Sequence, residues 1–202
     1  LPQNTDTRRD EEPTEAKPTT EFTYIPEYGI MINPADGERN VSFRTDTFIN
    51  MVGGIYEKVA QIAGEETAQN IFFDSGYDGG KNFAERINSK WGNGFSPEEI
   101  QKKIQKWCEF DSIVGWGKFE ADFRFDEEND TFDGELTITE AFIVDTENKR
   151  KVCAFIRGYC TGVLNTLLGG IKVELICKSC RLEKNFSRKC VFQVKMKGNT
   201  AI

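Results

Sequence analysis

The chain has 202 residues, of which 38% are hydrophobic and 29% charged, with six cysteines and no histidine. The missing imidazole excludes Ser-His and Cys-His nucleophile pairs, His-ligated zinc or iron, and histidine proton transfer near neutral pH. The net charge of -7 argues against a nucleic-acid or anionic-membrane surface covering the whole molecule.

The location of the protein is constrained by what its sequence lacks. No stretch of about 18 apolar residues occurs, so we expect no membrane span. The N-terminus also lacks the apolar core of a secretory signal, and we expect a cytoplasmic location. If a signal had been removed before secretion, the six cysteines could instead form three disulfides.

The chain opens with a segment unlike the rest. Residues 1–22 are rich in proline and acidic residues, which predicts a disordered tail. Residues 23–202 are then expected to form one ligand-binding domain. Its first helix is predicted over 43–63, where apolar residues are spaced by three and four, with Thr45 or Asp46 as the N-cap.

Two more helices are predicted before the hydrophobic pattern changes from helical to alternating. Residues 65–88 have helical periodicity, although three glycines weaken the middle of this helix and could kink it. The segment Ser96-Pro97-Glu98-Glu99 is a capping box with proline at the first helical position. It opens a third helix whose buried face is Ile100, Ile104 and Trp107.

The second half of the chain alternates between strand and helix patterns. Period-two alternation over 118–125 and 132–138 predicts a hairpin. Residues 150–168 predict a fourth helix, which a glycine pair ends. The last two strands are predicted at Ile171–Cys177 and Cys190–Lys197. This order indicates an α+β fold: a mostly antiparallel four-stranded sheet packs against three N-terminal helices, and one helix lies between the strand pairs.

The cysteines have the spacing of a metal site. Cys177-x2-Cys180 followed by Cys190 supplies three ligands. Cys153 and Cys160 lie about 10.5 Å apart along the fourth helix, so only one can complete a shell with zinc–sulfur bonds of about 2.3 Å. The strand after the glycine turn runs back toward the helix start, which favours Cys153.

We therefore predict a structural zinc site made of Cys153, Cys177, Cys180 and Cys190, closed to water by its four thiolates. Disulfides, unconnected thiols and an iron–sulfur cluster are the alternatives. The remaining Cys108 and Cys160 are expected to be small buried apolar residues.

Residues 150–196 resemble the C-terminal half of the 4-vinyl reductase domain family, and residues 43–90 resemble it more loosely. The resemblance is carried by Cys153 five residues before Gly158-Tyr159, the glycine turn, Cys180, and Cys190-Val191-Phe192. That family includes sensor domains of aromatic-responsive transcription activators and a protein linked to bacteriochlorophyll synthesis. Related folds occur in TRAPP trafficking subunits and heme-based nitric oxide sensors, and the absence of histidine argues against the heme branch. In the aromatic sensors the zinc ligands are three cysteines and a glutamate, and Cys177 stands at the glutamate position.

The resemblance implies an apolar pocket for a small hydrophobic or aromatic molecule and a homodimer formed through the first helices. Aromatic side chains that could line this pocket are Phe72, Phe73, Tyr77, Trp107 and Trp116. Ordinary core packing is the simpler interpretation of each of them. Gly158 and Gly162 are expected to let the fourth helix approach the sheet closely.

These observations favour a zinc-stabilised sensor or regulatory module without catalysis, which would need a separate output protein. The alternatives are an enzyme of tetrapyrrole or vinyl-group reduction and a scaffold subunit like the trafficking relatives. The basic segment 172–197 could bind nucleic acid or an acidic partner, but a solvated strand face explains it more simply.

Overall fold

The computed structural model describes six stretches of the chain: residues 22–33, 37–92, 94–126, 131–142, 149–178 and 189–197. The chain divides into two compact units, Leu1–Ser42 and Phe43–Ile202. The predicted tail lies outside the described residues except for Phe22, and the predicted zinc ligand Cys180 also lies outside them.

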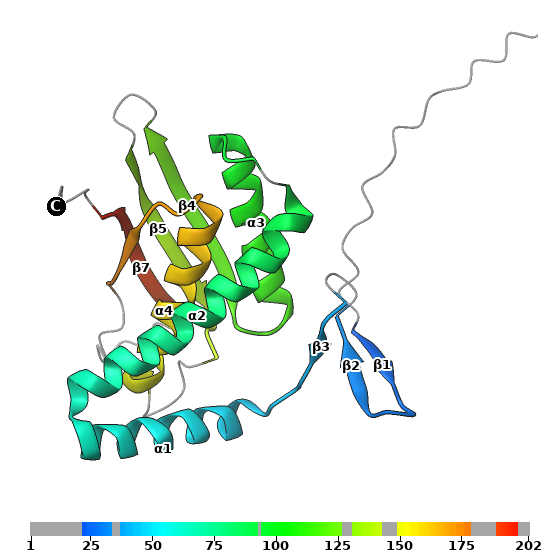
Figure 1. Cartoon of the computed structure of the whole chain (residues 1–202), viewed down its shortest axis with the longest axis vertical. Helices are drawn as coiled ribbons and strands as arrows, with labels where there is room; N and C mark the ends of the chain where they lie inside the picture. Colours follow the sequence, from blue (N-terminus) through cyan, green and yellow to red (C-terminus); the bar gives the residue numbers. More distant parts are fainter. Residues whose placement is uncertain are drawn as a thin grey trace, which may run out of the picture. The chain divides into compact units, whose positions relative to one another are not determined.

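The first unit contains a small antiparallel sheet that the sequence did not predict. Its strands are β1 (Thr23–Ile25), β2 (Ile30–Ile32) and β3 (Arg39–Asn40), in that order across the sheet (Figure 1). Strands of two or three residues are too short for period-two alternation to show in the sequence.

The second unit contains the four predicted helices. Their bounds are α1 Thr45–Ala63, α2 Glu65–Trp91, α3 Pro97–Ile113 and α4 Lys149–Leu167. The helix α2 continues without a break through its glycines. The capping box of α3 is confirmed, because Ser96 Oγ accepts from the Glu99 amide and the Glu99 carboxylate accepts from the Ser96 amide. No helix in the described parts of the chain is long and apolar enough to cross a membrane.

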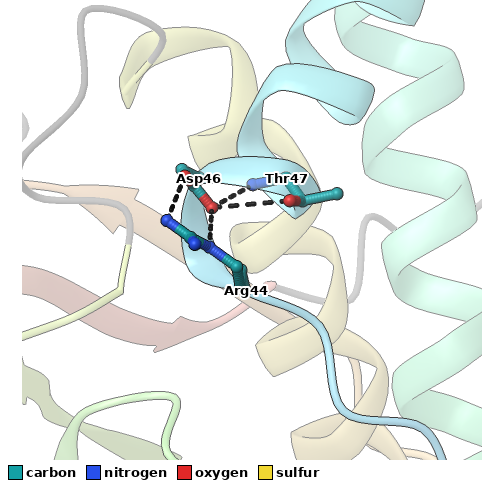
Figure 2. Close-up of polar contacts among 3 residues, drawn as sticks. All are labelled: Arg44, Asp46 and Thr47. Atoms are coloured by element: carbon teal, nitrogen blue, oxygen red, sulfur yellow. Dashed lines mark hydrogen bonds and ion pairs between the residues drawn. The ribbon is translucent and has the colours of Figure 1, made fainter.

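The N-terminus of α1 differs from the prediction. The N-cap is Arg44, so Thr45 and Asp46 lie inside the first turn and the predicted cap is wrong by one or two residues. Figure 2 shows the Asp46 carboxylate accepting hydrogen bonds from the Arg44 guanidinium, at 3.1 and 2.9 Å, and from the Thr47 amide at 2.7 Å. The bonds from Arg44 and then Thr47 lower the pKa of Asp46. The negative charge of Asp46 thus lies in the first turn of α1, where the helix dipole makes it stabilising.

The four-stranded sheet is antiparallel throughout and contains both predicted strand pairs. Its strands are β4 (Lys118–Asp126), β5 (Thr131–Thr139), β6 (Val173–Cys177) and β7 (Lys189–Met196), in the order β4-β5-β7-β6. One face is buried, and its fully covered residues include Phe119, Phe132, Leu136, Ile138, Val173, Leu175, Cys190, Phe192 and Val194.

The central element is α4, which lies between the sheet and α2 (Figure 1). Its glycines face α2 rather than the sheet, so the expectation for Gly158 and Gly162 is wrong in its direction. A Cβ atom on Gly158 would overlap the Phe73 carbonyl, and one on Gly162 would overlap the Tyr77 carbonyl. Gly76 and Gly80 of α2 meet the α4 carbonyls of Phe155 and Tyr159 in the same way. The two backbones are therefore in direct contact.

Candidate functional site

A buried carboxylate stands out in the core of the second unit. Asp111 lies four residues after Trp107, on the apolar face of α3, and is only 1% exposed. No described lysine or arginine forms an ion pair with it. Asp is almost never fully buried without a partner, so the groups around Asp111 need explanation.

Two neutral donors hold this carboxylate. Trp107 Nε1 donates to Oδ2 at 2.6 Å, and the Tyr159 hydroxyl, from α4, donates to Oδ1 at 3.1 Å. Each oxygen thus accepts one hydrogen bond within the protein. We call Trp107, Asp111 and Tyr159 the buried triad.

Burial dominates the protonation of this region. It raises the pKa of Asp111 to about 7, against the opposing effect of the hydrogen bonds from Tyr159 and Trp107. Burial also raises the pKa of Cys108 to about 12 and the pKa values of Tyr159 and Cys160 well above their ordinary range. These thiols and the phenol are therefore neutral at physiological pH, whereas Asp111 changes charge there. The predicted burial of Cys108 and Cys160 is confirmed.

Aromatic rings surround the buried triad. The Trp116 ring centroid lies 4.6 Å from that of Tyr159, 5.6 Å from Phe142 and 6.5 Å from Phe155. The Phe83 ring centroid lies 6.1 Å from that of Tyr159. We call the rings that contact Tyr159 directly or through a second ring the aromatic cluster: Phe83, Phe110, Trp116, Phe142, Phe155 and Tyr159.

The structure places the five predicted pocket residues in three groups. Trp107 and Trp116 both meet Tyr159, one through Asp111 and the other by ring contact. Phe72 packs edge-on against Tyr56 at 5.2 Å. Phe73 and Tyr77 stack on each other at 6.5 Å along α2.

Sequence reasoning missed Asp111 and Tyr159 as site residues. The available signal was a carboxylate four residues beyond Trp107 on an apolar helix face. The partner hydroxyl comes from a helix 48 residues away, and no local pattern reveals that pairing.

Three of the four predicted zinc ligands can be placed. Cys177 pairs with Phe192 across β6 and β7, so Cys177 and Cys190 lie on the same, core-facing side of the sheet in diagonal positions. Cys153 is half-buried against the same core from α4. Among the residues the structure describes, no group of three or more Cys, Asp or Glu is arranged to hold a metal ion. The thiol chemistry of the set fits zinc, and the fourth member, Cys180, is outside the described residues.

The fold places the second unit in a class of α+β domains in which helices cover one face of an antiparallel sheet. The chain is similar to the phenol-responsive sensory domain of the transcription activator PoxR, solved with phenol. The TM-score is 0.63 at 17% identity, over 87% of this chain and 84% of that domain. At this identity the likeness shows a shared fold.

Two other solved structures are less similar. One is a trafficking protein particle complex subunit 3 from Naegleria fowleri covalently bound to palmitic acid, with a TM-score of 0.46 and 16% identity over 75% of this chain and 96% of that chain. The other is a vinyl-4-reductase family protein from Methanocaldococcus jannaschii, with a TM-score of 0.45 and 18% identity over 78% and 84%. The relatives that the sequence resemblance implied therefore occur among the structural neighbours. No protein-family model matches the chain, and the search of curated proteins finds no match.

Proposed function

We propose that the unit from Phe43 to Ile202 is a sensory or regulatory domain that binds a small hydrophobic or aromatic molecule without transforming it. The observation that carries this proposal is the buried triad inside the aromatic cluster. Ligand sites in proteins are predominantly apolar, with a few polar groups that fix orientation, and strongly perturbed carboxyls are enriched in them. The fold shared with a phenol-responsive sensory domain supports the same function.

The chemistry of the triad suggests how such a ligand would be oriented. An aromatic ring would pack against Trp116 and Phe155, since offset or edge-to-face ring contacts are favourable. A polar group on that ring would reach the Asp111 carboxyl, the Tyr159 hydroxyl or both, in competition with their present bond. Rearrangement of a bond that joins α3 to α4 would then report the ligand to the rest of the domain.

The test is titration of the full chain with phenol, indole and toluene, followed by tryptophan fluorescence. Tyr159→Phe keeps the ring and removes one triad hydroxyl, so phenol should bind about tenfold more weakly to this variant. Tyr56→Phe is the matched control, because Tyr56 is also buried and its hydroxyl is bonded to Glu65 at 2.7 Å, outside the triad. Failure of all three compounds to bind, or equal weakening by both variants, would count against ligand binding at the triad.

The zinc and dimer expectations are part of the same proposal. Zinc held by Cys153, Cys177, Cys180 and Cys190 would tie α4 to the last two strands, and its closed thiolate shell would be structural. A homodimer would form through α1, where Met51, Ile55 and Ile62 are 48%, 52% and 86% exposed. A separate protein would carry the output.

Native mass spectrometry of protein from its own host reports metal, copurified ligand and oligomeric state together. A bound small aromatic molecule, one zinc ion per chain and a dimer are the expected result. A bound tetrapyrrole would favour the reductase alternative. A chain that carries no ligand and assembles with other proteins would favour the scaffold alternative.

A further inference from the structure

A second polar cluster lies where α2, the end of α4 and the start of β6 meet, and it shares no residue with the buried triad or the aromatic cluster. Its centre is the Tyr77 hydroxyl. Asn165 Nδ2 and Lys172 Nζ lie 3.3 and 3.4 Å from that oxygen.

The direction of these hydrogen bonds is fixed by their neighbours. The Asn165 side-chain oxygen accepts a 2.8 Å bond from the Val173 amide, which orients the side chain so that its NH2 group faces Tyr77. An ammonium group can only donate. The Tyr77 oxygen therefore accepts two bonds, and its own proton must point elsewhere. No described residue accepts that proton.

The Lys172 charge beside Tyr77 has no ion-pair partner among the described residues. Lys172 is exposed, and no described carboxylate lies within ion-pair distance of it, including Asp74 and Asp78 of α2. Lys81, one turn beyond Tyr77, has only a 3.7 Å pair with Glu85. The hydrogen bond from Asn165, followed by the bond and charge of Lys172, lowers the pKa of Tyr77 against the effect of burial, and this makes the phenol a stronger hydrogen-bond donor.

An aromatic surface continues from this cluster. Phe73 stacks on Tyr77 with an interplanar angle of 24°. The Arg157 guanidinium lies 5.3 Å from the Phe73 ring centre and also has no described carboxylate partner. This face thus combines hydrogen-bond donors, the cationic groups of Lys172 and Arg157, and the half-buried rings of Phe73 and Tyr77.

We propose that Tyr77, Lys172 and the adjoining Phe73 ring form a binding site for the oxyanion of a small organic acid. The Tyr77 hydroxyl and the Lys172 ammonium would each donate to the anion, and the apolar part of the acid would lie along Phe73. Asn165 is a positioning residue, since it orients the hydroxyl without reaching the ligand.

The test uses benzoate, with inorganic phosphate and the neutral isostere benzamide as comparison probes, in calorimetric titrations of the full chain. Benzoate should bind saturably and more weakly as salt rises, and benzamide should not bind. Tyr77→Phe and Lys172→Gln should each weaken benzoate binding about tenfold, because each removes one charge-assisted donor. Lys106→Gln, which removes an exposed charge from α3, should leave the affinity unchanged. Phosphate binding with the same variant dependence would show that the site accepts oxyanions in general, which also supports the proposal.

Tyr77→Phe retains its ring and Lys172 is exposed, so both variants should unfold cooperatively, and thermal scans check this. The Asn165 side-chain amide resonance should shift on benzoate addition in the native chain and not in Tyr77→Phe. Absence of benzoate binding, equal binding of benzamide, or affinity unchanged in both variants would overturn the oxyanion site. None of these results bears on binding at the buried triad, which is probed by phenol and Tyr159→Phe.

Discussion

Asp111 shows how a single residue can make the stability of a domain depend on pH. The ordinary pKa of its carboxyl is 3.8, and in the folded chain the pKa is about 7. Between these values the folded protein holds a proton that the unfolded chain has released. The stability that the neutral carboxyl contributes is fully present below about pH 4 and is lost as the pH rises through 7.

The Asp111→Asn variant should remove this pH dependence, because an amide has no proton to lose in the range. We expect the free energy of unfolding of the native chain, relative to the variant, to fall by the order of a few kcal/mol between pH 4 and pH 8. Urea unfolding at several pH values measures it. Asp122→Asn, at an exposed position of β4, is the control and should leave the slope in place. Parallel curves for the native chain and Asp111→Asn would contradict a raised pKa.

At this scale the sequence predicted which residues are buried better than it predicted what they do. Ile100, Ile104 and Trp107 are buried as the helical spacing indicated. The role of Trp107 as a donor to Asp111 was not predictable, because periodicity assigns a residue to a face and says nothing about its polar partner. Phe72, Phe73 and Tyr77 looked equivalent to Trp107 in the sequence. In the structure Phe72 packs on Tyr56, and Phe73 and Tyr77 stack on each other.

The packing of α2 on α4 depends on four glycines that interlock. In each helix they are four residues apart, and each faces a carbonyl of the other helix. Side chains at these positions would push the helices apart, since interiors have no spare volume. The close packing of α2 on α4 therefore requires a residue without a side chain at all four positions.

Neighbouring glycines of α2 provide a matched test of this packing. A Cβ at Gly80 would overlap the Tyr159 carbonyl, whereas one at Gly79 meets nothing within 4 Å. Gly80→Ala should destabilise the domain by about 1–3 kcal/mol or more. Gly79→Ala should stabilise it by about 0.5–1 kcal/mol through helix propensity. Chemical denaturation of the two variants decides, and a loss of the same size from both would mean that the crossing is looser than described.

Features of the helices and strands were predictable where neighbouring residues in the sequence determine them, and not where contacts with other elements determine them. The capping box of Ser96 and Glu99 correctly predicted where α3 begins, because all of its residues are close together in the sequence. The glycines of α2 suggested a weak helix because propensity counts their cost, whereas the structure uses two of them as contact points. The neighbour of Gly158 was misassigned for the same reason, since a glycine spacing does not reveal which element it faces.

For the whole molecule, the order of elements was sufficient to predict the α+β class and the two strand pairs. The hairpin from Lys118 to Thr139 is present as predicted, and the last two predicted strands, β6 and β7, pair antiparallel. The sheet formed by β1, β2 and β3 was missed because its strands are too short for a pattern. The cysteine spacing predicted a metal site that connects elements distant in sequence, and this remains a prediction.

Removal of the predicted zinc would test whether that site holds the C-terminal strands in place. Cys180→Ser should reduce bound zinc from about one ion per chain to almost none, since a structural site needs all four thiolates. Because β6 lies at the edge of the described sheet, where its neighbour is β7, both strands should then exchange their amide hydrogens faster, while α2 and α3 keep their protection. Cys108→Ser replaces a buried thiol outside the predicted set and should leave the zinc content unchanged. Full protection of β6 and β7 after complete chelation would show that these strands do not depend on a metal ion.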